Sequence, residues 1–371
     1  MKTPPVSPST RRSFLRHLAL GTAGLALGGR ALASGLAAAG APGRKLGVAL
    51  VGLGSYATHQ LAPALLESKY CRLAGIVTGT PEKAARWARD YALPDDCVYD
   101  YGTMDRLADN PAIDIVYVVT PPGLHAEHTI RAAQAGKHVI CEKPMAVSVA
   151  ECDAMIAACR KAGVHLSLGY RLQYHPMWQE LKRLVRVQEF GAFKTMSGGF
   201  GFRLRGGGWR LEKKLAGGGA LMDVGIYVVQ AACMAGGGAP LAVTASEPPK
   251  VRPDVFKEVD ETMDFTLEFA HGATCAGTTS YEISSNRFRA VAPEGSFEVE
   301  PAYSYNGLVG RTSKGPLPSS SAHQQAAQID GIAEAILAGT PSLVPGEMGR
   351  RDMQIITALY EAARNGQRVS L

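Results

Sequence analysis

Residues 46–68 constrain the fold of this chain more than any other segment. An apolar run at 46–51 is followed at once by the glycine turn Gly52-Leu53-Gly54-Ser55-Tyr56-Ala57 and then by a helical stretch at 60–68. A strand, a glycine turn and a helix in this order are typical of dinucleotide-binding proteins. Gly52 permits the tight turn, Gly54 lets the backbone approach a pyrophosphate, and Ala57 replaces a third glycine where helix and strand meet. A turn of this kind is as often a plain loop, so its surroundings decide its meaning.

The chain after this turn alternates between apolar and Ala-rich segments. Apolar runs at 72–77, 113–119, 138–141 and 164–168 are separated by helical stretches at 81–91, 124–135 and 148–162. Continuous apolar strands between helices predict a parallel, doubly wound sheet, an α/β fold of the Rossmann type, over residues 46–168. In such a sheet a dinucleotide lies across the C-terminal ends of the strands. We therefore expect it to contact the first turn at Gly52, Leu53, Gly54, Ser55 and Tyr56.

The end of the strand at 72–77 indicates which dinucleotide is bound. NAD sites carry an acidic residue there for the ribose 2′-hydroxyl. This chain has Val77-Thr78-Gly79-Thr80-Pro81-Glu82-Lys83 instead, in which Thr78 can donate to a 2′-phosphate and Lys83 can neutralise it. The sequence therefore predicts NADP as the cofactor. Lys83 fits equally well as a solvated lysine on a helix that Thr80 caps.

A lysine follows the strand at 138–141, in Cys141-Glu142-Lys143-Pro144. The nicotinamide end of a dinucleotide would lie at this strand end, so the charge of Lys143 would favour an alkoxide or phenolate beside it. Pro144 fixes the turn. The alternative is an ordinary lysine of a surface turn.

Asp223 and Tyr227 form a second candidate group. They follow the loop Gly217-Gly218-Gly219 and open an apolar helix, where a spacing of four residues places both on one face. Both side chains could therefore point at one substrate. The alternative is an aspartate that complements the helix dipole and a tyrosine at the edge of the core.

The run Gly136-Lys137-His138-Val139-Ile140-Cys141-Glu142-Lys143-Pro144-Met145 resembles the superfamily of glucose-fructose oxidoreductases, inositol dehydrogenases and rhizopine-catabolism proteins (Gfo/Idh/MocA). Its glucose-fructose oxidoreductase branch is more similar, since Tyr227 stands where many other members have histidine. Similar stretches span nearly all of the chain after its leader: 52–60, 78–84, 124–127, 169–171, 209–211, 215–227, 325–330 and 360–364. The glycine turn is generic, whereas the Lys143-Pro144 motif joined to Asp223 and Tyr227 is specific.

The resemblance implies a role for each site residue. Tyr227 would exchange the proton of a sugar hydroxyl, Asp223 would orient the sugar, and Lys143 would supply the positive charge that a tyrosine needs at neutral pH. Pro122 stands where the family usually has asparagine, so any side-chain contact from that position is lost. No metal ion is expected. Further contacts to the cofactor are implied for Thr120, His125, Glu142, Lys143, Arg171, Trp209 and Arg210, and to the substrate for Tyr170 and Tyr305.

Residues 169–371 are expected to form a second, α+β domain. Alternating or β-branched stretches at 193–203, 241–246, 261–270, 273–280, 287–292 and 295–300 predict a large, mostly antiparallel sheet. The resemblance implies that helices cover one face and that a second subunit packs on the other, which gives a homo-oligomer, either a dimer or a tetramer. Residues 311–321, rich in Ser and Pro, are predicted to form a mobile surface loop.

The first 33 residues have the features of an export signal. Thr10-Arg11-Arg12-Ser13-Phe14-Leu15-Arg16 precedes an apolar stretch at 18–29, too short to span a membrane, and then the small residues Ala31-Leu32-Ala33. This order predicts a twin-arginine signal peptide, cleavage after Ala33 and a periplasmic protein. A short arm, 34–45, would precede the first strand. A disordered basic tail is the alternative.

The net charge of +6 depends on this leader. Its five basic residues, subtracted from 39, leave 34 against 33 acidic residues. A near-neutral body argues against nucleic acid or an anionic membrane surface as a partner. Seven cysteines, an odd number without a Cys-x-x-Cys pair, argue against a disulfide framework or a zinc ribbon.

Together these inferences predict a periplasmic sugar oxidoreductase that retains NADP. An exported enzyme finds no pool of free nicotinamide cofactor, so one sugar would reduce the bound NADP and a second would reoxidise it in a ping-pong cycle. A glucose-like aldose would leave as its lactone, and fructose or an aldose would leave as an alditol. The alternatives are an aldose-aldose oxidoreductase, a conventional NADP-dependent aldose dehydrogenase and a sugar-binding sensor without activity. Lys143, Asp223 and Tyr227 together argue against the sensor.

Overall fold

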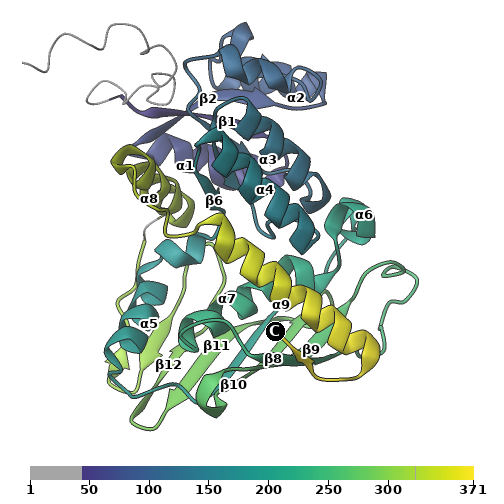
Figure 1. Ribbon diagram of the computed structural model, residues 1–371, viewed down its shortest axis with the longest axis vertical. Helices are drawn as coiled ribbons and strands as arrows, with labels where there is room; N and C mark the ends of the chain where they lie inside the picture. Colours follow the sequence, from purple (N-terminus) through teal and green to yellow (C-terminus); the bar gives the residue numbers. More distant parts are fainter. Residues whose placement is uncertain (1–43, 322) are drawn as a thin grey trace, which may run out of the picture. The chain divides into compact units, whose positions relative to one another are not determined.

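The computed structural model describes residues 44–321 and 323–371. The predicted signal peptide and all but the last two residues of the predicted arm lie outside the described residues. The described part of the chain contains a sheet of six strands and a sheet of nine strands, each with helices packed against it (Figure 1). This confirms the predicted fold class, a Rossmann sheet joined to an α+β domain.

All strands of the first sheet are parallel and lie in the order β3-β2-β1-β4-β5-β6. β1 and β4 are buried along their whole length, as expected where helices cover both faces of a parallel sheet. The short β3 has no signal of its own in the sequence. The strands are β1 (Leu46–Val51), β2 (Cys71–Val77), β3 (Val98–Tyr99), β4 (Ile115–Val118), β5 (His138–Cys141) and β6 (Leu166–Leu168), and the helices between them are α1 (Ala62–Glu67), α2 (Pro81–Asp90), α3 (His125–Gln134) and α4 (Val149–Ala162).

The second sheet has the order β14-β13-β12-β11-β7-β10-β9-β8-β15. Its pairs are antiparallel except β7 with β10, so the predicted mostly antiparallel sheet is confirmed. Its strands are β7 (Thr195–Gly201), β8 (Ala242–Ser246), β9 (Thr262–Glu268), β10 (Thr274–Ser280), β11 (Ser285–Ala292), β12 (Gly295–Val299), β13 (Gly310–Thr312), β14 (Gly315–Pro316) and β15 (Val369–Ser370).

The second sheet has one buried and one exposed face. Along β11 Phe288 and Ala290 are buried, whereas Arg287 and Arg289 are exposed. The helices α5 (Pro176–Val187), α7 (Ile226–Ala235) and α9 (Gly346–Asn365) lie over the buried face (Figure 1). The segment Lys213–Ala235, which includes the short α6 (Lys213–Ala216) and α7, is long and apolar enough to cross a membrane by length and composition, but 89% of its most apolar window is buried. It therefore serves here as the core of the second domain.

Helix α8 (Gln324–Ala338) belongs to the second domain by sequence but packs against α1 and β2 of the first. Asp330 on α8 accepts hydrogen bonds from the Ser68 hydroxyl and from the backbone N–H of Lys69 and Tyr70. Asp330 thus provides an acceptor for the polar hydrogen atoms of the short segment between α1 and β2. The first domain is therefore completed by a helix from the last fifty residues, roughly, of the chain.

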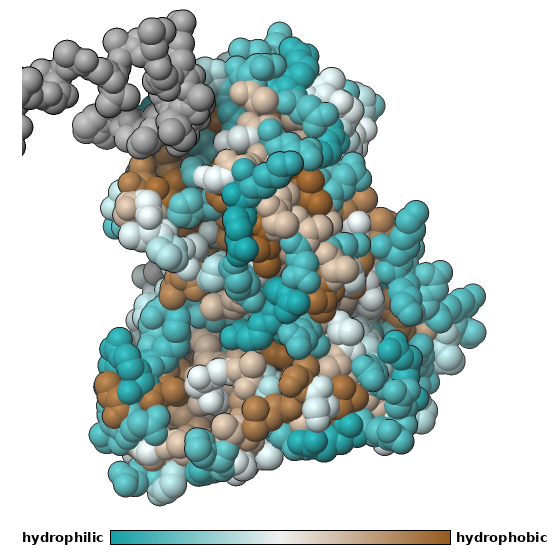
Figure 2. Space-filling model, viewed as in Figure 1, coloured by the Kyte–Doolittle hydropathy of each residue, from teal (hydrophilic) through white to brown (hydrophobic). Residues whose placement is uncertain are grey.

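The predicted loop at 311–321 is wrong for its first half. Residues 310–316 form a hairpin of β13 and the edge strand β14, in which Arg311 pairs with Glu298 of β12. The Ser and Pro residues that suggested a loop lie mostly after this hairpin. All seven cysteines lie in the described part of the chain, and each is buried and unpaired. Hydrophilic side chains cover much of the face in Figure 2, with hydrophobic patches between them.

Candidate active site

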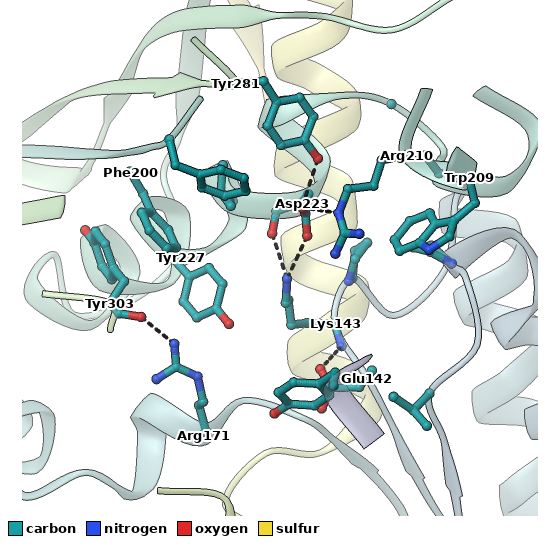
Figure 3. A pocket seen from close by; sticks show the side chains of 18 of the residues that line it. Glu142, Lys143, Arg171, Phe200, Trp209, Arg210, Asp223, Tyr227, Tyr281 and Tyr303 are labelled. Atoms are coloured by element: carbon teal, nitrogen blue, oxygen red, sulfur yellow. Dashed lines mark hydrogen bonds and ion pairs between the residues drawn. The ribbon is translucent and has the colours of Figure 1, made fainter. Parts of the chain in front are cut away.

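A cavity of 330 Å³ lies where the C-terminal ends of β4 and β5 meet residues of the second domain. Its wall is rich in aromatic rings; Lys143, Arg210 and Tyr281 converge on Asp223, and Arg171 lies on the other side of Tyr227 (Figure 3). The first domain and the segment that follows it contribute Tyr56, Val119, Thr120, Pro122, His125, Glu142, Lys143, Pro144 and Arg171; the rest of the second domain contributes Phe200, Phe202, Trp209, Arg210, Ala216, Gly218, Asp223, Val224, Tyr227, Tyr281, Asn286, Tyr303, Ser304 and Tyr305.

Asp223 is the centre of the polar side of the cavity. The Nζ of Lys143 donates to its backbone oxygen at 2.7 Å and to Oδ1 at 3.1 Å. Arg210 Nε and the Tyr281 hydroxyl donate to Oδ2, at 3.0 and 2.9 Å. Burial raises the pKa of Asp223, but Lys143 and Arg210 outweigh it and hold this pKa well below its usual range. Both carboxylate oxygens therefore have protein partners, so Asp223 fixes Lys143 and Arg210 in place.

Tyr227 lies between two cations. Lys143 Nζ is 4.9 Å from the centre of the Tyr227 ring, and the Arg171 guanidinium carbon is 5.2 Å from it. Phe200 contacts the ring edge-on, with the centroids 5.3 Å apart. The structure thus brings Lys143, Asp223 and Tyr227 together in one cavity, as the sequence predicted (Figure 3).

Lys143 follows β5, and its ammonium group lies between Asp223 and the Tyr227 ring. Burial lowers its pKa, but Tyr227 and Asp223 outweigh burial, so this pKa is raised above the ordinary value. Lys143 therefore remains an ammonium ion. Burial also raises the pKa of the neighbouring Glu142, whose Oε1 accepts from the Tyr117 hydroxyl at 2.7 Å. Tyr117 in turn accepts from Gln328 of α8 at 2.8 Å, which links α8 to the site.

Arg171 supplies a buried cation, with 2% of the residue exposed. Its guanidinium donates to the backbone oxygens of Tyr303 and Ser304 and to the side chain of Gln324. It also lies 4.6 Å from the centre of the Tyr305 ring. Within the described residues no ion pair joins Arg171 to an acidic side chain, so its positive charge acts on the cavity.

The glycine turn after β1 fits a dinucleotide. Gly52 has a φ of 97°, which favours glycine, and a Cβ there would lie 3.0 Å from Thr120 Cγ2. A Cβ on Gly54 would meet no atom within 4 Å, so the backbone faces open space where a phosphate could approach. Leu53 is buried behind the turn and Ser55 is exposed.

The end of β2 carries the two residues predicted to select the cofactor. Thr78 is buried at the strand end, and Lys83 is half-buried in the first turn of α2. Thr80 is the N-cap residue of α2, as the alternative expected, although its side chain makes no hydrogen bond to the helix N-terminus. This edge is compatible with a 2′-phosphate.

His125 lines the cavity but is occupied by the backbone. Its Nε2 lies 2.7 Å from the Thr120 oxygen and its Nδ1 lies 2.9 Å from the Pro144 oxygen. Burial lowers the pKa of His125 to about 4. A neutral imidazole carries one N–H, so His125 donates to one of these two oxygens while its ring packs between the loop after β4 and the loop after β5. The Thr120 hydroxyl contacts His128 at 3.1 Å.

Tyr170 is the predicted substrate residue that the structure places elsewhere. It does not line the cavity; it is buried, and burial and the nearby Asp352 raise its pKa. The neighbouring Arg171, the first residue of a 3₁₀ turn at Arg171–Tyr174, enters the cavity instead. Trp209 and Tyr305 do line the cavity, and Arg210 lies 4.4 Å from the centre of the Trp209 ring.

Several residues that line the cavity were not predicted from the sequence. Phe200, Tyr281 and Tyr303 come from β7, from the residue after β10 and from the chain beyond β12. None belongs to a recognisable motif. Only their aromatic character near strand ends could have drawn attention to them. No three His, Cys, Asp or Glu side chains within 44–321 and 323–371 come together as a metal site would require.

Two family models match the chain. Residues 46–170 match the Gfo/Idh/MocA oxidoreductase family with an NAD-binding Rossmann fold, and residues 178–298 match the Gfo/Idh/MocA C-terminal domain. The chain therefore belongs to the Gfo/Idh/MocA family, whose members are dinucleotide-dependent oxidoreductases. The resemblance found in the sequence is confirmed.

Particular relatives narrow the class further. The structure of an aldose-aldose oxidoreductase from Caulobacter crescentus, complexed with glycerol, is 44% identical, superposes with a TM-score of 0.86 and covers 88% of this chain and 100% of that one. A D-xylose 1-dehydrogenase (NADP(+)) of Haloferax volcanii is 30% identical over 338 residues, 87% of this chain and 98% of that protein. A trans-1,2-dihydrobenzene-1,2-diol dehydrogenase of Xenopus tropicalis is 32% identical over 51% of this chain. The chain is an oxidoreductase of the class that acts on sugar CH–OH groups.

Proposed function

We propose that this protein oxidises an aldose at C1 with NADP and passes the electrons to a second sugar. The observation that carries the proposal is the placement of Lys143, Asp223 and Tyr227 on one side of an aromatic cavity at the strand ends where a nicotinamide would lie. The first sugar would leave as a lactone and the second as an alditol.

Tyr227 is the proposed acid-base group. Its phenolate oxygen takes the proton of the C1 hydroxyl during oxidation, and the resulting phenol hydroxyl gives that proton to the carbonyl oxygen of the second sugar. Lys143 and Arg171 flank its ring and stabilise negative charge on the oxygen atoms that lose the proton. The glycine turn after β1 and the end of β2 would hold NADP, which would supply the hydride acceptor for C1 of the first sugar and the hydride donor for the second. The aromatic wall excludes water and offers apolar faces to the sugar ring.

The choice of NADP rests on Thr78 and Lys83. The end of β2 carries Thr78 where NAD sites have an acidic residue, and Lys83 follows in the first turn of α2. The xylose dehydrogenase relative is named for NADP(+), which supports the same choice.

The second sugar is proposed to be another aldose. The 44% identical structure is that of an aldose-aldose oxidoreductase, and this favours an aldose over fructose as acceptor. The twin-arginine leader and periplasmic location, which remain proposals from residues 1–33, support a retained cofactor, because folded export would carry it along. Replacing both Arg11 and Arg12 by Lys should leave the protein in the cytoplasm, as measured by cell fractionation.

One experiment separates this proposal from a conventional aldose dehydrogenase. Protein dialysed without added nucleotide should give one stoichiometric burst of absorbance at about 340 nm with an aldose, and a second aldose should discharge it. Initial rates should then give parallel double-reciprocal lines. If dialysis strips the nucleotide and turnover follows added NADP, the protein is a conventional dehydrogenase. If no aldose reduces bound or added NADP, the sugar assignment is wrong.

A homo-oligomer is proposed through the exposed face of the nine-stranded sheet. Small and polar side chains such as Ser197 of β7 and Ala276 of β10 are exposed there, next to the exposed Arg287 and Arg289 of β11. An exposed sheet face of this kind can pair with the same face of a second copy by two-fold symmetry. Light scattering should report a dimer or tetramer, and Ala276→Arg should shift it to a monomer. A wild-type monomer at micromolar concentration would contradict the proposal.

A further inference from the structure

The loop Gly217-Gly218-Gly219 is a thin wall beside the active-site cavity. Gly218 lines that cavity and also a second cavity, of 300 Å³, whose lining includes Asp260 and Tyr360. A Cβ on Gly218 would lie 2.0 Å from the Tyr360 hydroxyl oxygen, and a Cβ on Gly219 would lie 1.8 Å from the Asp260 backbone oxygen. Gly219 therefore has no room for a side chain, whereas a methyl group on Gly218 fits only if the Tyr360 side chain moves.

Asp260 holds this wall through its carboxylate. Its Oδ1 accepts from the Gly219 backbone N–H and from the Tyr360 hydroxyl, both at 2.6 Å. Its Oδ2 accepts from the Leu221 backbone N–H at 2.8 Å. A carboxylate that binds N–H groups at the start of a helix acts as a cap. Here the cap comes from residue 260 rather than from the helix's own sequence.

The capped turn carries Asp223. The residues Leu221–Gly225 form one turn of π-helix that leads into α7. Lys143 donates to both the backbone oxygen and the carboxylate of Asp223 in this turn. The position of the Lys143 ammonium ion therefore depends on the position of this turn. A chain of contacts connects Tyr360 of α9, through Asp260 and the turn, to Lys143.

We propose that Asp260 and Tyr360 are positioning residues for the acid-base group, acting through Asp223. The inference deepens the function proposed above and rests on its assignment of Lys143. Neither residue needs to touch the sugar or the cofactor. Both act by fixing the turn that carries Asp223. Asp223 in turn holds the Lys143 ammonium ion next to the Tyr227 ring.

Tyr360→Phe tests the proposal with the loss of one oxygen atom. We expect kcat for aldose oxidation to fall about three- to tenfold, with the KM for the aldose, the Kd for NADP and the thermal midpoint nearly unchanged. Tyr174→Phe, which removes the hydroxyl of a half-buried tyrosine that lines neither cavity, is the matched control and should keep kcat. An unchanged kcat in Tyr360→Phe, or equal losses in both variants, would overturn the proposal.

A double mutant adds a test that a merely structural role would not pass. Gly218→Ala should push the Tyr360 hydroxyl away from Asp260, so its effect on kcat should overlap that of Tyr360→Phe. The double variant should then be no slower than Gly218→Ala alone. If the loss of kcat in the double variant equals the product of the two single losses, the two residues do not act through the same contact with Asp260.

A readout without turnover separates this inference from the function it rests on. The rate at which an amine-reactive reagent modifies Lys143, followed by mass spectrometry of the labelled peptide, should rise severalfold in Tyr360→Phe because Asp223 holds the ammonium ion less firmly. An altered labelling rate with no aldose activity in the wild type would reject the proposed function alone. An unaltered rate would reject the positioning role.

Discussion

The side chain of Lys143 bridges the two domains by reaching Asp223, eighty residues further along the chain, at both its backbone oxygen (2.7 Å) and its Oδ1 (3.1 Å). The ammonium ion thus belongs to the first domain but is placed by the second. Any change in the turn that carries Asp223 changes the charge beside Tyr227, and the first predictions concern that charge.

Tyr227→Phe should leave NADP bound but reduce turnover by two or more decades, in line with the roughly 10²- to 10⁴-fold that a general acid-base group supplies. Tyr305→Phe, in the same cavity, should instead act mainly on the KM for the sugar. Steady-state rates and a fluorescence titration of NADP measure both effects. Near-normal turnover of Tyr227→Phe would move the proton transfer to another group, with Lys143 the next candidate.

Arg171→Gln should slow the reduction of bound NADP by an aldose about tenfold or more, because the buried guanidinium no longer stabilises negative charge on the cavity side of Tyr227. Arg171→Lys keeps the charge and should retain more of the burst rate. Stopped-flow absorbance compares the two variants. Equal burst rates would mean that Arg171 acts through its hydrogen bonds to residues 303, 304 and 324 and not through its charge.

Lys83→Glu should weaken NADP binding far more than NAD binding, since a contact to the 2′-phosphate becomes a repulsion. Arg89→Glu reverses a charge on the same helix, where Arg89 pairs with the exposed Asp90, and should affect both dinucleotides little. Isothermal titration gives the four affinities. Equal losses for NADP and NAD in Lys83→Glu would remove Lys83 from the cofactor site.

The sequence predicts the elements that have a strong periodic signal. β1, β4 and β5 are continuous apolar runs bounded by turns, and their parallel order follows from the helices between them. β3 and the β13–β14 hairpin contain two or three residues per strand, too few to show an alternation. Their pairing is decided by neighbouring strands and not by local sequence.

The site was predictable where a residue stands in a motif. Lys143, Asp223 and Tyr227 adjoin turns that can be recognised, whereas Tyr281 reaches Asp223 from the end of β10, a contact that only the folded sheet creates. Tyr170 and Arg171 illustrate a second limit, since one residue of offset decides which of two neighbours enters the cavity. A motif can be recognised in the local sequence, but the direction in which each of its side chains points cannot be predicted from it.

Asp223→Asn should destabilise the protein at neutral pH, because it leaves Lys143 and Arg210 in the cavity without their carboxylate. Breaking a buried ion pair in this way costs about 3–5 kcal/mol, and since Arg210 is partly exposed we expect the lower part of that range. The folded-state pKa of Asp223 lies below that of the unfolded chain, about 3.9. The stabilisation from its charge is therefore fully present above that pH and is lost as the pH falls toward the folded-state pKa.

The difference in thermal midpoint between wild type and Asp223→Asn should thus stay constant from about pH 8 to pH 5 and narrow below about pH 4. Calorimetry across this range measures it, with Asp153→Asn as the control, because Asp153 forms an exposed pair with Arg350 and such pairs contribute little. A difference that is absent at neutral pH would mean that hydrogen bonding alone holds Lys143. If the wild type still folds at pH 3 and the difference persists there unchanged, the loss of stability in Asp223→Asn comes from the altered packing of the side chain and not from its lost charge.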